Sequence, residues 1–387
     1  MTGTWLTSLD GGQGKLLVSG VAADYASGFL LYVRGDVLMA QAIDPASGNL
    51  KGDSRVLVDH VLIGPGGVLV TVSANRLLYQ AGGQVRDRQL TWFDRSGRNL
   101  DVIGEAGDYF DVRLSPDEQR LAVNAGSPFS DIWVQELAHP VHMRLTIDPA
   151  TDHGIMVWSP DGTRIAYSAL SGKAQLGIYE KRSNGVGSEE LLLAANNADG
   201  GVLPTSWSPD GKLLLFSHGT IPQPSGLWIL PLSGDHKPRP VPNAPSSAEG
   251  GQFSPDGKWI AFTSRESGTD EVYVMPFDSS LKTSPASESG SKWQISTRGG
   301  RCPRWRGDGK EIYWLSPRGQ IMAAQIEYKD SGIQALTPEA VLQAGIEMVI
   351  FEPYDVTRDG KKFVVNTLRD SEGALTLMVN WTARLNQ

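Results

Sequence analysis

The sequence predicts an all-β fold, an eight-bladed β-propeller whose blades are four-stranded antiparallel sheets. A short turn motif recurs six times between apolar runs, and its aspartate steps along the chain by 44 to 52 residues. That period is typical of propeller blades, whereas helical repeats are mostly shorter. Each copy is also followed by alternating apolar and polar residues, the pattern of half-buried strands. The six motifs lie at 114–117, 158–162, 207–211, 253–257, 305–309 and 356–360.

The motif itself is expected to be a tight turn between two strands. In the copy at 158–162, Pro160 presets its own φ, while Asp161 and Gly162 tolerate turn and left-handed backbone. Strand patterns over 164–168, 177–180 and 190–193 follow it, so the repeat holds four strands. The large residue before each turn recurs at one position, which favours a core role between blades over ligand contact. These large residues are Leu114, Trp158, Trp207, Phe253, Trp305 and Val356.

Two weaker copies, at 72–75 and 25–28, bring the count to eight, with seven as the fallback if the first packs irregularly. The last unit lacks a fourth strand, and residues 15–19 form a strand without a unit. Pairing the two would close the ring and remove exposed edges. We therefore expect one propeller domain over 1–387. Its blade units fall near 20–63, 64–107, 108–150, 151–198, 199–247, 248–299, 300–346 and 347–387, with 1–19 completing the last.

The composition of the chain narrows the classes of partner and of site that it can have. The net charge of −8 argues against nucleic acid, which needs a concentrated basic face. The single cysteine, Cys302, excludes an intramolecular disulfide and a cysteine-rich metal site, and we expect it buried beside Trp305. No apolar run could span a bilayer and no secretion signal opens the chain. We expect a soluble monomer that does not insert into membranes, extracytoplasmic (periplasmic) if its parent is membrane-anchored and otherwise cytoplasmic.

The Trp-Ser-Pro-Asp-Gly motif resembles the TolB-like, WD40-like group of propellers over the whole chain. More distantly it resembles the propeller of the dipeptidyl peptidase and prolyl oligopeptidase families. The phrases at 38–41, 88–97, 250–257, 292–296 and 379–383 are similar to the C-terminal propeller of acidobacterial-type transmembrane serine/threonine protein kinases. This resemblance implies a non-catalytic sensor or protein-interaction module, on the outer side of the cytoplasmic membrane.

No catalytic residues are predicted. The chain has no glycine-rich ATP loop, no His-Arg-Asp or Asp-Phe-Gly motif and no Gly-x-Ser-x-Gly elbow. No cofactor and no metal are expected either, since His139, His142 and His153 are interpreted as ordinary surface histidines rather than ligands. The alternative is a propeller enzyme, a hydrolase or lyase with a small-molecule or metal site at the channel mouth. Its candidate residues are Asp111, Arg113, His153 and Arg304.

An acidic residue recurs five to nine residues before the Ser or Thr of the motifs, in the loops that lead into the innermost strands. These loops ring one mouth of a propeller channel, so we hypothesise a recognition face for a cationic protein or peptide. The competing interpretation is ordinary turn chemistry in solvated loops. A third is a partner docked on the blade sides through the loops 233–250 and 278–290. Neighbouring Arg and Tyr side chains could add bidentate or aromatic contacts. The predicted binding residues are Asp108, Tyr109, Asp111, Arg113, Asp152, His153, Asp199, Glu249, Arg304, Glu352 and Tyr354.

Overall fold

The computed structural model confirms the all-β class. It describes residues 3–7, 14–19, 21–35, 37–59, 61, 63–64, 67–68, 70–80, 88–126, 130–139, 141–147, 151–172, 176–195, 201–220, 223–279, 292–330, 332–344, 346, 352–368 and 375–386. Apart from one 3₁₀ helix, η1 (Trp381–Asn386), every regular element in these ranges is a strand. No helix in this part of the chain is long and apolar enough to cross a bilayer. Two compact units are present, 1–87 with 369–387, and 88–368.

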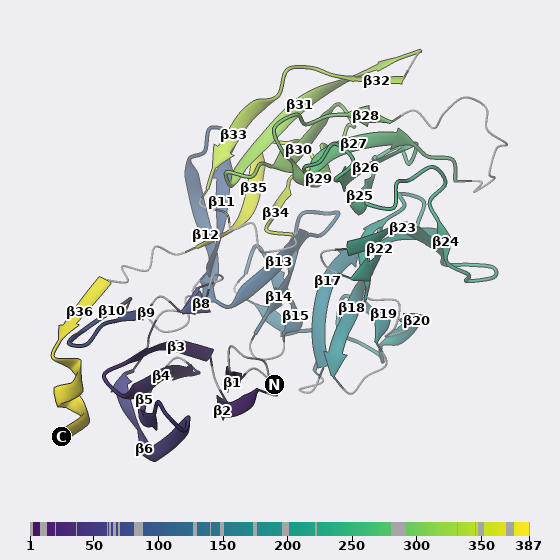
Figure 1. Cartoon of the computed structure of the whole chain (residues 1–387). Coiled ribbons are helices and arrows are strands. Elements are labelled where there is room, and N and C mark those ends of the chain that lie inside the picture. Colours follow the sequence, from purple (N-terminus) through teal and green to yellow (C-terminus); the bar gives the residue numbers. More distant parts are fainter. Residues whose placement is uncertain are drawn as a thin grey trace. The chain divides into compact units, whose positions relative to one another are not determined.

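The second unit is built of sheets that follow one another in chain order (Figure 1). Five of them run from the innermost strand outward. The first sheet is β13 (Tyr109–Leu114), β14 (Arg120–Ala125), β15 (Asp131–Glu136) and β16 (His142–Arg144), and the second is β17 (Thr151–Trp158), β18 (Arg164–Gly172), β19 (Gly177–Arg182) and β20 (Glu190–Ala194). The third is β21 (Gly201–Trp207), β22 (Leu213–Thr220), β23 (Gln223–Pro231) and β24 (Arg239–Pro240), and the fourth is β25 (Glu249–Phe253), β26 (Trp259–Ser264), β27 (Glu271–Pro276) and β28 (Trp293–Gln294). The fifth is β29 (Arg301–Trp305), β30 (Glu311–Leu315), β31 (Gln320–Lys329) and β33 (Glu339–Gln343), and β32 (Gly332–Ala335) pairs with the far part of β31.

The sixth sheet closes this unit with strands from both ends of its sequence. Its order is β12 (Asn99–Gly107), β11 (Arg88–Asp94), β35 (Lys362–Leu368) and β34 (Tyr354–Val356). Seven residues of β11 pair with β35, with Thr91 opposite Val365. Each first strand contacts the next from β13 to β29, and β34 contacts β13. The described part of 88–368 therefore forms six blades, so the predicted count of eight is not confirmed.

The last blade is closed differently from the prediction. Residues 15–19 form β2 (Lys15–Ser19), which pairs with β1 (Gly3–Leu6) and not with β35. The reason lies in burial: Phe363, Val364 and Val365 of β35 are fully buried, so both faces of this strand need covered neighbours. The alternating, largely buried strand β11 provides that environment, whereas Leu16 of β2 is exposed.

The first unit contains a four-stranded sheet and a smaller one. The larger is β3 (Val21–Ala26), β4 (Phe29–Arg34), β5 (Val37–Asp44) and β6 (Asn49–Val58). The smaller has the order β36 (Leu375–Val379), β10 (Arg76–Gln80), β9 (Val70–Val72), and β7 (Ile63–Gly64) pairs with β8 (Gly67–Val68). One hydrophobic core, which includes Leu38, Leu77 and Trp381, is shared by the sheet β3–β6, the sheet β36-β10-β9 and η1. The strands predicted as one blade over 64–107 are thus divided, with β9–β10 here and β11–β12 in the second unit.

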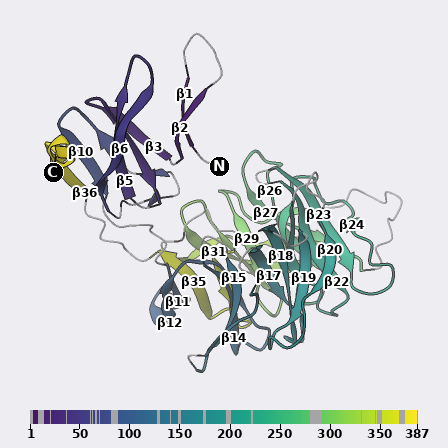
Figure 2. The same ribbon diagram turned by 90° about the horizontal axis from the view of Figure 1, so that it is seen from below.

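The recurrent motif is a turn, as predicted. The Ser159 hydroxyl donates to Asp161 at 2.5 Å and accepts from the backbone N–H of Arg164 at 2.9 Å. Gly162 takes φ +69°, the left-handed value that favours glycine. The large residues before the turns are core: Trp158, Trp207 and Phe253 each belong to a hydrophobic cluster shared by two neighbouring blades. Figure 2 shows these blades from below.

Candidate functional site

Five charged side chains on or beside three first strands of the second unit come together. We call them the inner-strand cluster: Asp111 and Arg113 of β13, Arg304 of β29, Glu352 just before β34, and Asp355 within it. Arg304 pairs with one carboxylate oxygen of Glu352, and Nη2 of Arg113 lies 3.1 Å from the other. Nε of Arg304 lies 3.4 Å from Asp355. The cluster thus links three blades through charges.

Backbone hydrogen bonds hold the carboxylates of this cluster in place. Asp111 accepts from the backbone N–H of Glu352 at 2.8 Å, and Asp355 accepts from that of Leu114 at 2.9 Å. The Tyr354 ring lies under the Arg304 guanidinium, 5.6 Å from its centroid. These bonds all run between strands of different blades, so the cluster fixes the relative position of the first strands.

Burial raises the pKa values of the carboxyl groups in the cluster. Asp111 and Glu352 are each 3% exposed, and Arg304 is 4% exposed. Removal from water raises the pKa of Asp111 to about 7, with the Glu352 carboxylate adding to the rise. Burial also raises the pKa of Glu352, against the lowering effect of Arg304, and that of Asp355. Three carboxyl groups share two arginines, so one of them lies close to its protonation point near neutral pH.

A second charged group includes the residues that begin two first strands and is partly exposed. Arg301, the first residue of β29, pairs with Glu249 of β25 at 3.1 Å and with Asp270 at 3.3 Å. Arg265 binds the same Asp270. Because Glu249 begins β25 and Arg301 begins β29, the group lies where loops lead into the first strands. We call this end of the second unit the channel-mouth face.

His153 is not the surface histidine that the sequence suggested, since it is only 3% exposed. Its Nδ1 lies 3.3 Å from the carbonyl of Ser130 and 3.5 Å from Asp131, and its ring meets Tyr167 edge to face. These contacts fit a satisfied core histidine at the inner end of the blade. His139 and His142 are exposed. Among the described residues, no three His, Cys, Asp or Glu side chains are grouped as a metal ion would need.

The other predicted residues are spread along the face. Tyr109, half-buried, donates its hydroxyl to the carbonyl of Glu105, and the carbonyl of Asp108 accepts from Gly126. Asp152 lies in β17, but its side chain is outside the description, and Asp199 lies outside the described residues. The predicted loop 233–250 is not loop throughout, since it contains β24 and the start of β25, whereas most of 278–290 is not described.

Sequence reasoning missed Asp355, Arg301 and Asp270. Asp355 directly follows the predicted Tyr354, and Arg301 lies three residues before the predicted Arg304, so adjacency was the available signal. Cys302, between them, is only partly buried and has φ +55°. The thiol itself is removed from water although the residue as a whole is only partly buried, and this burial, with the nearby Glu352 carboxylate, holds the pKa of the thiol well above its usual value. This thiol is therefore a poor nucleophile at neutral pH.

Comparison with known proteins shows which sequences this chain is similar to. No protein-family model matches the sequence. An uncharacterized protein of Agrobacterium fabrum, Atu1656, is 27% identical over 216 residues, which is 53% of this chain and 67% of that protein. The Tol-Pal system protein TolB of Anaeromyxobacter dehalogenans is 32% identical over 111 residues, 28% of this chain. The chain matches only 24% of the length of that TolB.

A solved structure matches over a longer range. The structure of a putative TolB from Agrobacterium tumefaciens superposes with a TM-score of 0.54 at 19% sequence identity. The match covers 74% of this chain and 99% of that one. At this identity the likeness concerns the fold alone, and it agrees with the ring of four-stranded blades described above. The fold of this protein is therefore a β-propeller, similar to the fold of that putative TolB.

Proposed function

We propose that this chain is a non-catalytic recognition module that binds a protein or peptide partner at the channel-mouth face. The observation that carries the proposal is the inner-strand cluster, which ties together the first strands β13, β29 and β34, whose entry loops form that face. A rigid base lowers the entropy that the loops above it lose when a partner binds. The buried cluster positions the face, and the partly exposed residues around it contact the partner.

The charges on the channel-mouth face indicate what kind of partner it would bind. Glu249 is matched by Arg301, and Glu352 by Arg304, so the acidic residues do not form an uninterrupted negative ring. A cationic segment would compete with Arg301 for Glu249, an exchange of one partly exposed ion pair for another. Such exchanges contribute little affinity and more to encounter rate and specificity. Aromatic contacts, for which Tyr109 is available, would then supply most of the affinity.

The setting of the module is part of the proposal. The Anaeromyxobacter relative carries the name of the Tol-Pal system, and we extend from it a role in a protein assembly outside the cytoplasm. The phrases between the motifs support a finer placement, as the sensor propeller of a membrane-bound serine/threonine kinase. A single transcript and protein band that joins a kinase domain to this chain would support that placement. A separate, self-contained protein in the source cell would contradict it.

Site-specific photo-crosslinking tests the function. A photoreactive residue in place of Tyr109 reports on the channel-mouth face, and one in place of Asp235 reports on the opposite end. Asp235 lies in the turn between the third and fourth strands of its blade, which antiparallel order puts away from the loops leading into the first strands. We expect a light-dependent protein adduct in source cells at position 109 and none at 235. Adducts at 235 alone, or at neither position, would overturn the proposal.

One observation favours a second candidate, an enzyme at the same face. The pKa of Asp111, near 7, is suited to proton transfer, and arginines lie beside it. Asp111 is only 3% exposed, so a substrate would need the first strands to part. Turnover of esters, lactones or sugar acids by the wild type that is lost in Asp111→Asn would favour this candidate over the recognition module.

A further inference from the structure

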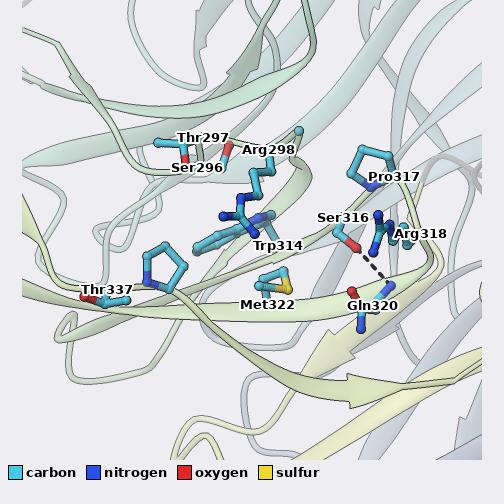
Figure 3. A pocket seen from close by; sticks show the side chains of 12 residues that line it. Ser296, Thr297, Arg298, Trp314, Ser316, Pro317, Arg318, Gln320, Met322 and Thr337 are labelled. Carbon is cyan, nitrogen blue, oxygen red and sulfur yellow. Dashed lines mark hydrogen bonds between the residues drawn. The ribbon is translucent and has the colours of Figure 1, made fainter.

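A cavity of about 480 Å³ lies between the fourth and fifth of the blades counted from β13, and no member of the inner-strand cluster lines it (Figure 3). One side is the loop 295–300 that follows β28. The other side is β30, the turn 316–319 and the start of β31, with residues 337–338 at the edge. None of the predicted site residues lines it. Its lining residues are Ser296, Thr297, Arg298, Gly299, Trp314, Ser316, Pro317, Arg318, Gln320, Met322, Thr337 and Pro338.

The walls of this pocket are held in place by internal hydrogen bonds. The buried carboxylate of Glu271 accepts from the Ser296 hydroxyl and from the Gly299 N–H, the latter at 2.9 Å. Gly299 has φ +87°, and a Cβ there would clash with Pro317 of the facing turn. On the other side, Ser316 accepts from the N–H of Gln320 at 3.2 Å. Both loops are therefore set before any ligand arrives.

The floor of the pocket is apolar. Trp314, fully buried among neighbouring core residues, shows one edge to it, and the Met322 side chain lies next to it (Figure 3). Pro317 and Pro338 add apolar surface at the two edges. A floor of this kind takes the apolar body of a ligand about as large as an aromatic side chain.

The opening of the pocket is cationic. Arg298 comes from one loop and Arg318 from the facing turn, and both are exposed. Within the described residues, neither guanidinium has an acidic partner. The carboxylates nearby are bound to other groups. Glu271 binds Ser296 and Gly299, and Asp270 pairs with Arg265 and Arg301. Glu339 pairs with Arg95. In a chain of net charge −8, two uncompensated arginines on one apolar pocket are a local excess of positive charge.

The geometry points to a binding site for an organic carboxylate with an apolar body, held by Arg298 and Arg318 over the floor of Trp314 and Met322. Arginine suits this task because its planar guanidinium binds a carboxylate through two parallel N–H donors. Such a ligand has two sources, a free aromatic acid or the C-terminus of a peptide that ends in an apolar residue. The inference does not depend on the proposed partner at the channel mouth, since the residues and the ligand are different.

Titration with defined probes tests the site. The full chain is titrated by calorimetry with phenylacetate, with a tripeptide ending in free phenylalanine, and with the same tripeptide amidated at its C-terminus. We expect the acid forms to bind at least fivefold more tightly than the amide, and binding to weaken as salt is raised. Arg298→Gln and Arg318→Gln should each weaken binding of the acids at least threefold. The control Arg182→Gln removes the same charge from an exposed site on β19 and should leave binding unchanged.

The outcomes separate the sources and the alternatives. Tighter binding of the peptide acid identifies a chain terminus as the ligand, and equal or tighter binding of phenylacetate identifies a free acid. Equal binding of acid and amide, or equal effects of the Arg298, Arg318 and Arg182 variants, would overturn the inference. A matched thermal unfolding curve for each variant confirms that the fold is intact.

Discussion

Arg304 and Glu352 form a buried ion pair between the first strands of two neighbouring blades, although 48 residues separate them in the sequence. Nη2 of Arg113, from a third blade, lies 3.1 Å from the other oxygen of the same carboxylate. A buried charge that loses its partner cannot be solvated, so removing one member of such a pair strongly destabilises the contact between the blades. The channel-mouth face therefore depends on contacts between blades more than on the loops themselves.

Replacing Arg304 by methionine tests this dependence. The substitution keeps the apolar stem and leaves the Glu352 carboxylate buried with Arg113 as its remaining partner. We expect a loss of about 3–5 kcal/mol in the free energy of unfolding, measured with urea. The matched control, Arg301→Gln, breaks the neighbouring pairs with Glu249 and Asp270, in which the arginine is about one-third exposed, and should cost about 1 kcal/mol or less for each pair. Equal losses for the two variants would show that the buried cluster has no special role.

Asp111→Asn should change how stability depends on pH. The pKa of Asp111 in the folded protein, about 7, lies above that of an unfolded aspartate, so the folded state holds its proton longer. The contribution of Asp111 to the free energy of unfolding is therefore fully present below pH 4. It is lost as the pH rises to about 7, and the loss amounts to at most about 4 kcal/mol. Asparagine can still accept from the Glu352 N–H but does not ionise.

Unfolding measured from pH 4.5 to 8 should therefore show a flatter decline for the Asp111 variant than for the wild type. Glu352 and Asp355, whose pKa values are also raised, keep part of the decline in both proteins. Parallel curves for the two proteins would mean that Asp111 does not titrate in this range.

Ser159→Ala tests the repeated turn. The serine hydroxyl accepts from the Arg164 N–H and donates to Asp161, and the alanine variant leaves these groups without that partner. We expect a loss of about 1–3 kcal/mol in the free energy of unfolding, since the site is fully buried. Ser233→Ala, at an exposed loop position, serves as the control and should change stability by less than about 0.5 kcal/mol.

The repeat was readable from the sequence because its signal is local. Ser159, Pro160, Asp161 and Gly162 lie side by side in the chain, and their turn follows from their own backbone preferences and short-range hydrogen bonds. The position of Trp158 in the core followed from its recurrence. Even the first motif, which lacks glycine, keeps the turn, with Glu118 at φ +58° in the glycine's place.

The closure of the ring was not readable from the sequence. The strands of residues 15–19 and of β11 are both short apolar segments, and alternation alone does not tell which of them will pair with β35. Burial on both faces of β35 decides it, with Val364 covered on one face and Phe363 and Val365 on the other, and burial is a property of the assembled blades. The site shows the same limit: Arg304 and Glu352 were predicted to share one face, but the ion pair between them and the part of Asp355 depend on the register between blades.

The most direct test of this account is to express residues 88–368 alone. These residues contain both halves of the closing sheet, β11–β12 and β34–β35, together with all five members of the inner-strand cluster. If β11 and β35 close the ring, this fragment is a monodisperse protein that unfolds in a single cooperative transition and keeps the pH dependence set by Asp111. A fragment that aggregates or lacks cooperative unfolding would show that the ring is not closed by β11 and β35, and would contradict the account.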